Sequence, residues 1–350
     1  MQTFIPVPGE TGRQNTLTIL KSGGLCSIQD LGRPGSQHLG FSGGGAADEH
    51  AYLTANQLLG NEANAAALEI TLGQLVLRAE CHCTLAVTGA DCRIYLNEQP
   101  VSNWQVLQLA AGDTLAFSLP TSGLHNYLAV YGGIDAPLWL GSRAQTLNER
   151  NLAAAQKEIS AGCDIPLTPF CFNPGAGQAP KQQQRKKAYA NFYPDGVLTA
   201  RFIPHKLWFS LDSKLQQRFL DAEYTIDRDS NRMGYRLTSK HAALPQENPG
   251  GSPDITLPTG LSRAVAFGSI QLPDFRRPIV LMKERQTIGG YPVIGAVMQT
   301  DLFRLSQKRP GESLRFIPVS LEQARQQLAE FYRQRLNSDS SQFRPAHAPG

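Results

Sequence analysis

The feature that most constrains this chain is a series of short apolar segments, rich in β-branched residues and bounded by Gly, Asp or Pro. They lie at 17–20, 67–72, 75–79, 84–88, 93–96, 114–118 and 126–131, and again at 198–204, 235–238, 264–272, 279–282, 293–299 and 313–317. Short segments separated by turn residues are typical of antiparallel strands that close into a barrel or sandwich. We therefore expect a mainly β chain with a few helices.

Three segments with helical periodicity interrupt the strands. Residues 46–59 carry small apolar residues on one face and end at a glycine, and residues 213–221 follow the helix-capping Asp212. The last segment begins at Ser320, which can form a capping box with Gln323. Its expected buried stripe consists of Leu321, Ala324, Leu328 and Phe331.

The composition changes at residues 173–194, where Gly, Pro, Gln and Lys dominate. We interpret this stretch as a basic linker between a domain at 14–172 and a second domain at 195–318. A C-terminal helix is expected at 319–337, and residues 338–350 are expected to form a disordered tail.

Charge and apolar patterning argue against two classes of partner. Much of the net charge of +4 comes from residues 181–187 and from arginines near the C-terminus, whereas a nucleic-acid surface needs a denser basic stripe with aromatic residues. No apolar run is long enough to cross a bilayer, and no signal-peptide core begins the chain. Six cysteines without a CxxC pair suit a reducing compartment. We therefore expect a cytoplasmic protein that binds neither nucleic acid nor membrane.

The triplet Cys81–His82–Cys83 raises the question of a metal site. Successive side chains of a strand point to opposite faces, so His82 cannot easily join both thiols. We interpret the triplet as ordinary strand residues and expect no metal.

The stretch VLMKERQTIGGYPVIGAV, at 280–297, places three charges between two apolar runs. An ionised group that is buried without a partner costs several kcal/mol. Lys283, Glu284 and Arg285 therefore either lie on a solvated turn or converge on a ligand, and we expect them at the rim of a cleft between the domains.

Two further polar clusters, at 29–33 and 231–236, leave the same two alternatives open. Each lies beside a predicted strand and contains Arg or Gln side chains that can hold a carboxylate or an amide. Glu69 lies in the middle of a predicted strand, where it either faces water or lines a pocket.

The glycine-rich segments do not match an established catalytic or nucleotide-binding motif. Residues 40–44 fit G-x-S-x-G around Ser42, but a loop-like stretch precedes them where a nucleophile elbow needs a strand. Residues 43–45 either present backbone N–H groups to an anion at a helix start or only form a tight turn. The sequence has no G-x-x-x-x-G-K-[ST] loop, so any ATP needs another geometry or another protein chain.

The polar clusters resemble a known family. The string SIQDLGR at 27–33 is similar to the opening motif of the biotin-dependent carboxyltransferase-like family, which includes the C subunit of 5-oxoprolinase, the KipA proteins and the carboxyltransferase part of urea carboxylase. Further similar blocks follow in the family's order, at 42–48, 55–61, 66–73, 88–90, 127–135, 140–143, 232–237, 269–273, 278–282, 286–287 and 289–292. Within the family, the run ALEITLGQ most resembles the 5-oxoprolinase C subunit.

This resemblance implies two tandem cyclophilin-like β-barrel domains and a partner that is a 5-oxoprolinase B subunit or a KipI-like protein, together with the A subunit. The complex would open 5-oxoproline to L-glutamate with ATP hydrolysis, and the ATP site would be shared with the partner. Two alternatives within the resemblance are a biotin-dependent carboxyltransferase acting on an amide such as urea and a non-catalytic KipA-type regulator of a KipI-like partner. The chain has no Met-Lys-Met attachment site, so we expect no covalent biotin on it.

The resemblance also assigns expected roles to the polar residues. A phosphorylated lactam needs positive charge and an orienting carboxylate. The catalytic candidates are Asp30, Asp48, Glu69, Arg232 and Arg285. The substrate-binding candidates are Gln29, Arg33, Ser42, Asn56, Arg236, Gln271, Gln286, Thr287, Gly289, Gly290 and Tyr291. Among these, Arg232, Arg236 and Arg285 are the expected anion clamps, and Gln271 and Gln286 the expected amide readers.

The sequence departs from the family pattern beside the expected pocket. Lys283 and Glu284 stand where the family usually has a small residue and Asp, and residues 43–47 and 144–160 also differ. These departures leave a shifted substrate or a lost activity open.

Overall fold

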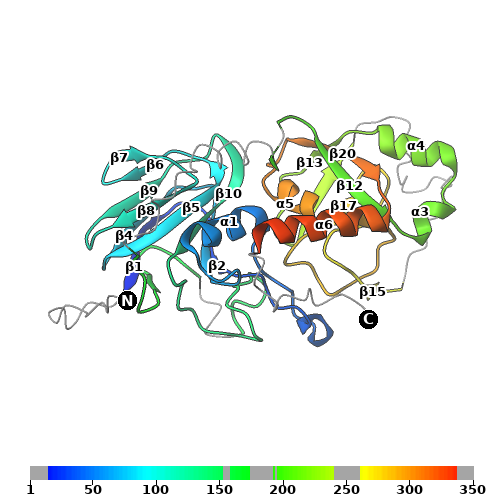
Figure 1. Ribbon diagram of the computed structural model, residues 1–350. Helices are drawn as coiled ribbons and strands as arrows, with labels where there is room; N and C mark the ends of the chain where they lie inside the picture. The colour runs from blue at the N-terminus through cyan, green and yellow to red at the C-terminus, as the bar shows by residue number, and fades with distance from the viewer. Residues whose placement is uncertain (1–14, 153–157, 174–191, 194, 240–260, 337–350) are drawn as a thin grey trace.

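The computed structural model describes residues 15–152, 158–173, 192–193, 195–239 and 261–336, and Figure 1 shows two β-rich domains side by side. The first domain has a six-stranded sheet with the order β11 (Asp164–Pro166), β1 (Thr16–Ser22), β4 (Leu75–Ala79), β9 (Thr114–Phe117), β6 (Ile94–Leu96) and β7 (Gln99–Val101). Its five-stranded sheet has the order β2 (Cys26–Gln29), β3 (Ala67–Thr71), β10 (Ser122–Val130), β5 (Cys83–Asp91) and β8 (Gln105–Leu109). Apolar side chains from both sheets form one core, so the sheets pack face to face.

The second domain is a closed barrel of seven strands. Around the barrel the order is β12 (Leu198–Pro204), β19 (Val293–Val297), β16 (Ser269–Gln271), β17 (Ile279–Leu281), β14 (Gly234–Thr238), β13 (Tyr224–Ile226) and β20 (Ser313–Pro318). Strands β12 and β20 pair in parallel and close the barrel. A separate two-stranded ribbon consists of β15 (Arg263–Ala264) and β18 (Ile288–Gly289).

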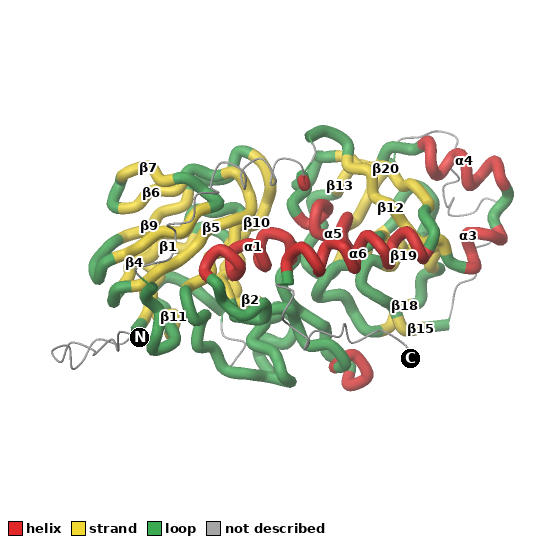
Figure 2. Tube along the Cα trace, viewed as in Figure 1, coloured by secondary structure: helices red, strands yellow, loops and turns green. Residues whose placement is uncertain are grey.

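The helices concentrate at two places (Figure 2). Helices α1 (Glu49–Leu59), α5 (Gln299–Ser306) and α6 (Leu321–Arg335) meet between the domains, whereas α3 (Lys206–Ser210) and α4 (Ser213–Asp221) lie at the far end of the barrel. A short 3-10 helix, η1, covers Ser36–Leu39. The junction of α1, α5 and α6 has its own apolar cluster, which includes Tyr52, Tyr127, Phe303 and Phe331.

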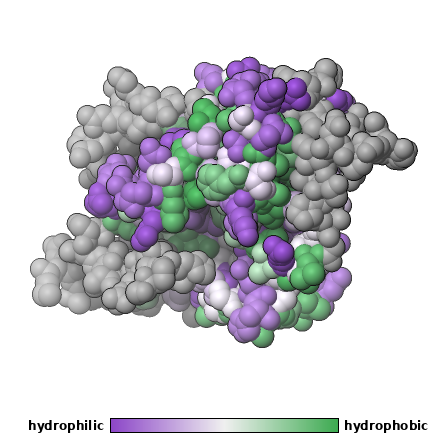
Figure 3. All heavy atoms as spheres, turned by 90° about the vertical axis from the view of Figure 1, so that its right-hand side faces the viewer, coloured by the Kyte–Doolittle hydropathy of each residue, from purple (hydrophilic) through white to green (hydrophobic). Residues whose placement is uncertain are grey.

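The surface at the far end of the barrel is mixed in character. Hydrophobic side chains lie among hydrophilic ones in the view toward that end (Figure 3), and Phe209 of α3 is 71% exposed. Among the helices of the described ranges, none is both long and apolar enough to pass through a bilayer.

The predicted fold class is confirmed: the chain is mainly β with a few helices. The second domain is a closed barrel, whereas the first consists of two sheets that pack face to face. Two helix starts are also confirmed. The carboxylate of Asp212 accepts from the N–H of Leu215 at 2.8 Å, and Ser320 forms a capping box with Gln323. Most of the predicted linker at 173–194, and all of the predicted tail at 338–350, lie outside the described residues. The boundaries at 14–172, 195–318 and 319–337 therefore stay predictions.

Three predicted elements are wrong in part. The strand predicted at 293–299 ends at Val297, because α5 begins at Gln299. The strand predicted at 264–272 is divided between β15 and β16, and Gly268 between them has a φ of +85°, which an extended strand does not allow. Leu321 of the predicted apolar stripe is 57% exposed, because the first turn of α6 lies away from the junction.

Helix α6 is expected to stabilise the protein through one aromatic anchor. The ring of Phe331 is 6% exposed and lies 5.3 Å from the ring of Phe303. Phe331→Ala should lower the free energy of unfolding by about 3 kcal/mol, measured by urea denaturation, because it leaves a cavity at the junction. The matched control Leu321→Ala should change it by about 0.5 kcal/mol or less. Equal losses in the two variants would contradict this packing.

Candidate functional site

Arg232, in the turn before β14, joins the two domains. Its guanidinium donates to the carboxylates of Glu69 on β3 and Glu284 after β17, and to the carbonyl of Gly45 at 2.8 Å. All three ionised side chains are buried. Burial opposes the charge of Arg232, but the carboxylates of Glu69 and Glu284 together hold its pKa above the usual value. Arg232 is thus occupied by partners within the protein and is not an open anion clamp.

Glu69 neither faces water nor lines an open pocket. Besides Arg232, its carboxylate accepts from the hydroxyl of Tyr127 at 2.7 Å and from the N–H of Ala47 at 2.9 Å. Burial favours the neutral acid, but the nearby charge of Arg232 holds the pKa of Glu69 below its ordinary value. Glu69 therefore stays ionised as part of the connection between β3 and the barrel.

Asp48 connects three separate segments. Its carboxylate caps α1 by accepting from the N–H groups of His50 at 3.0 Å and Ala51 at 3.2 Å. It also accepts from the Nε2 of Gln307, just after α5, at 2.8 Å and from the hydroxyl of Tyr193. Burial raises the pKa of Asp48 to about 6, against the lowering effect of these hydrogen bonds.

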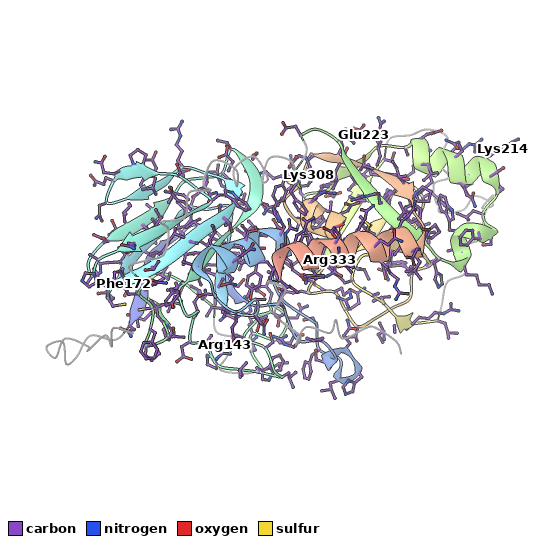
Figure 4. All side chains as sticks on the ribbon, viewed as in Figure 1. Arg143, Phe172, Lys214, Glu223, Lys308 and Arg333 are labelled. Atoms are coloured by element: carbon purple, nitrogen blue, oxygen red, sulfur yellow. The ribbon has the colours of Figure 1, made fainter. Side chains whose placement is uncertain are left out.

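Asp30 holds the loops beneath the first domain. Its carboxylate accepts from the N–H of Gly32 at 2.7 Å, from the hydroxyl of Ser142 at 2.6 Å and from the N–H of Arg143 at 2.6 Å. Figure 4 shows Arg143 among these loops. The contacts of Asp30 thus order the loop around Ser142.

Arg33 stabilises the same loops as Asp30. Its guanidinium donates to the carbonyls of Ser42, at 3.2 Å, and Ala144, and lies 4.7 Å from the ring centroid of Trp139. The side chain is 1% exposed. Its charge is therefore satisfied by backbone oxygens and an aromatic face and is not presented to a ligand.

Three other expected binding residues also have internal partners. The amide nitrogen of Gln29 donates to the carbonyl of Gln145 at 2.9 Å, and that of Asn56 donates to the carbonyl of Ala65 at 2.9 Å. The hydroxyl of Ser42 donates to Glu149 at 2.8 Å. Each of the three side chains is buried and stabilises a loop or a helix end.

The charged stretch after β17 is buried and does not form a solvated rim. The Nζ of Lys283 lies 2.5 Å from the carboxylate of Glu49 on α1, and Glu284 accepts from the N–H of Leu147 at 2.9 Å in addition to Arg232. The prediction of a cleft rim is wrong here, because both side chains are buried and paired within the protein. The departures at Lys283 and Glu284 thus have a structural reason.

Arg285 and Gln271 have few hydrogen-bond partners among the described residues. Arg285 is 7% exposed and makes a single hydrogen bond within the described ranges, from Nε to the carbonyl of Val265 at 3.3 Å. Burial lowers the pKa of Arg285 to about 10. The Nε2 of Gln271 is buried and has no hydrogen-bond partner in the part of the chain that the structure describes.

The remaining expected site residues lie either at the β15–β18 ribbon or on the outside of the barrel. Gly289 pairs with Arg263 in the β15–β18 ribbon. Gln286, Thr287, Gly290 and Tyr291 are exposed or half-buried beside that ribbon. Arg236 on β14 is exposed on the outside of the barrel, so the structure does not bring it to the junction.

Sequence reasoning missed several residues that complete the junction. Glu49 pairs with Lys283, and the amide of Gln307 donates to Asp48 and to the carbonyl of His125 at 3.0 Å. The unusual charge at Lys283 was the one signal that an acid had to lie nearby. Nothing in the sequence around Glu49 or Gln307 indicates a partner in the other domain.

Comparison with known proteins identifies the family. Residues 39–318 match the family model described as "Carboxyltransferase domain, subdomain A and B". The chain belongs to this carboxyltransferase-domain family. The resemblance expected from its motifs is therefore confirmed.

Within the family, the chain is similar to proteins of two kinds. It is 33% identical over 308 residues to the 5-oxoprolinase C subunit of Escherichia coli (strain K12), a match that covers 88% of this chain and 93% of that protein. It is 25% identical over 320 residues to "Urea amidolyase" of Lachancea kluyveri, 88% of this chain but 17% of that protein. The crystal structure of K. lactis urea amidolyase has a similar fold, with a TM-score of 0.77 at 24% identity over 94% of this chain and 20% of that chain.

The raised pKa of Asp48 predicts a pH-dependent stability. The ordinary pKa of 3.8 applies in the unfolded chain, and the folded value is about 6. The folded state therefore holds the proton more tightly, and this contribution to stability is lost as the pH rises from about 4 to about 6. Asp48→Asn keeps a good helix cap and should abolish this fall, which we expect to be about 2 kcal/mol.

Urea denaturation of the wild type and of Asp48→Asn at several pH values measures how the free energy of unfolding of each depends on pH. The matched control Asp212→Asn, at the exposed cap of α4, should have the same pH dependence as the wild type. If the free energy of unfolding fell equally between pH 4 and 6 in the wild type and in Asp48→Asn, the raised pKa of Asp48 would be contradicted.

Proposed function

We propose that this chain is the C-type component of an ATP-dependent 5-oxoprolinase. In this proposal it acts with partner proteins to convert 5-oxo-L-proline to L-glutamate. The observation that carries the proposal is the similarity to the 5-oxoprolinase C subunit over 93% of that protein's length. The similarity to a urea amidolyase is lower, at 25% identity over 320 residues.

The proposed chemistry explains why partners and ATP are needed. A five-membered lactam is a poor electrophile, so its carbonyl oxygen first receives the γ-phosphoryl group of ATP and ADP leaves. Water then attacks the activated carbon, and the C–N bond opens to give a free amine and an acyl phosphate. A second water hydrolyses the acyl phosphate, which releases phosphate and leaves the side-chain carboxylate of glutamate. Because the sequence has no P-loop, we assign the ATP site wholly or partly to a partner, either a B subunit or a KipI-like protein, with the A subunit as a second partner.

The contribution of this chain would be a rigid surface that positions the lactam. Arg232 is held between Glu69 and Glu284 by buried ion pairs, so the junction between the domains is already ordered and does not have to reorganise when charge develops nearby. The family relatives are enzymes or enzyme subunits by their printed names, which supports a role in catalysis. A cytoplasmic location, consistent with six cysteines that are all free, belongs to the same proposal.

Reconstitution tests the proposed function. The purified chain, its A-type and B-type partners, ATP and 5-oxoproline should release glutamate and ADP in equal amounts, and omitting this chain should abolish both products. Glutamate release that continues without this chain would contradict the proposal.

Two control reactions separate the alternatives. Carboxylation of urea with a biotinylated carrier protein, without 5-oxoproline turnover, would favour the carboxyltransferase activity. Copurification with the B-type partner without turnover of either amide would favour a regulatory role.

A further inference from the structure

Two thiols of the first domain lie in direct contact. Cys81 lies in the turn between β4 and β5, where the sequence predicted a strand residue, and Cys171 follows β11. Their Sγ atoms are 3.6 Å apart, although the two residues are 90 positions apart in the chain. Cys81 is 9% exposed and Cys171 4% exposed. Since an S–S bond is about 2.05 Å long, the sulfurs have to approach by about 1.5 Å to form one.

The backbone around Cys171 is held against the start of β5, which keeps the two thiols together. The carbonyl of Cys171 accepts from the N–H of Thr84 at 2.8 Å, and the N–H of Asn173 donates to the hydroxyl of Thr84 at 2.9 Å. The thiol of Cys171 donates to the carbonyl of His82, in the same turn as Cys81, at 3.5 Å. Rotation of the two side chains, without a change of the backbone, can therefore bring the sulfurs together.

Other cysteines of the chain direct their thiols to oxygen atoms. The thiol of Cys92 donates to Oδ1 of Asn126 at 3.4 Å, and that of Cys163 donates to the carbonyl of Glu158 at 3.8 Å. Cys81 and Cys171 are by contrast in sulfur–sulfur contact, which is the arrangement that a disulfide needs before it forms.

We infer that Cys81 and Cys171 form a redox modification site that hydrogen peroxide converts to a disulfide. The thiolate of Cys81, the more exposed of the two, attacks one oxygen of the peroxide, and the O–O bond breaks to give a sulfenic acid and hydroxide. The thiolate of Cys171 then attacks the sulfur of Cys81, the S–S bond forms and a second hydroxide leaves. The protons of the two thiols convert the two hydroxides to water. Two thiols are thus oxidised, and one peroxide is reduced to two waters.

Burial makes the site slow to react and selective for a small oxidant. The hydrogen bond with Cys81 and burial both raise the pKa of the Cys171 thiol above its ordinary value, so little of its thiolate is present at neutral pH. Hydrogen peroxide is little larger than water, whereas a glutathione disulfide needs more access to the sulfur. In a reducing compartment the pair therefore stays in the dithiol form and is oxidised only when peroxide accumulates.

The disulfide ties the last described segment of the first domain to its β4–β5 turn. Figure 4 shows Phe172, the residue after Cys171, on the side of this domain that faces away from the barrel. The site is thus separate from the Arg232 junction and independent of the proposed function. A bond that closes a loop of 90 residues restricts the unfolded chain, so oxidation should raise the melting temperature by about 5 °C or more.

Peroxide treatment of the full-length chain, followed by thiol counting in urea and peptide mapping, tests the site. Two of the six thiols should be lost, and the tryptic peptides 79–93 and 158–181 should appear joined, with two hydrogen atoms fewer than their sum. Both peptides contain other cysteines, so tandem mass spectrometry has to assign the bond to Cys81 and Cys171. Dithiothreitol should restore both thiols and the original melting temperature, which separates the disulfide from methionine oxidation.

Single variants separate this pair from the other cysteines. Cys81→Ala and Cys171→Ala should abolish the joined peptide and the rise in melting temperature. The matched control Cys83→Ala, which removes a buried thiol at the start of β5, should keep both. In Cys171→Ala the sulfenic acid of Cys81 lacks its contacting thiol, so dimedone should label Cys81 in this variant and not in the wild type.

Four results would overturn the assignment. They are survival of both thiols in peroxide-treated wild type, oxidation at Cys163 alone, a joined peptide that persists in Cys171→Ala, and a disulfide that forms without raising the melting temperature. If an alanine variant melts far below the wild type before treatment, the fragment spectra of the wild type decide. A bond between any other two cysteines in those spectra overturns the assignment, and a bond between Cys81 and Cys171 supports it.

Discussion

The structure depends on one buried interaction, the contact of Arg232 with Glu69 and Glu284. Glu69 belongs to the first domain, and Arg232 and Glu284 belong to the second, so the Arg232–Glu69 ion pair fixes the two domains relative to each other. A buried arginine between two carboxylates is stable only when all three groups keep good geometry. The requirement explains why Tyr127, Ala47 and Leu147 donate further hydrogen bonds to the two carboxylates.

A second set of contacts also joins the two domains, at α1 and its cap. Lys283 pairs with Glu49, the hydroxyl of Tyr332 donates to the same carboxylate at 2.5 Å, and Gln307 reaches Asp48. These contacts come from the segments that follow β17 and α5 and from α6, and all of them reach α1 or its cap. The charges that the sequence presents as candidates for ligand binding are thus largely used for domain docking. Within the described ranges, Arg285 instead makes one hydrogen bond, to the carbonyl of Val265, and the Nε2 of Gln271 makes none.

Local features of the fold could be predicted from the sequence, and contacts between distant residues could not. The caps at Asp212 and Ser320 depend on neighbouring backbone groups, so their residue types were sufficient. The end of β19 at Val297 was missed because the apolar pattern continues into α5 without a turn residue.

The polar clusters indicated buried sites, but the sequence did not show what pairs with them. The first-domain partners of Lys283 and Arg232 lie more than 160 residues away in the chain and had no local signal. The motif resemblance placed Arg236 among the clamps, although its strand position turns it outward.

A double-mutant cycle between Glu69 and Arg232 tests the central interaction most directly. The free energies of unfolding of the wild type, Glu69→Gln, Arg232→Met and the double variant give the coupling between the two side chains. Arg232→Met leaves the buried carboxylates of Glu69 and Glu284 without their cation, whereas Glu69→Gln removes the ion pair between the domains and leaves Arg232 paired with Glu284. We therefore predict a favourable coupling energy of about 2 kcal/mol or more. Additive effects of the two substitutions would contradict the account, because the domains would then be held together without this ion pair.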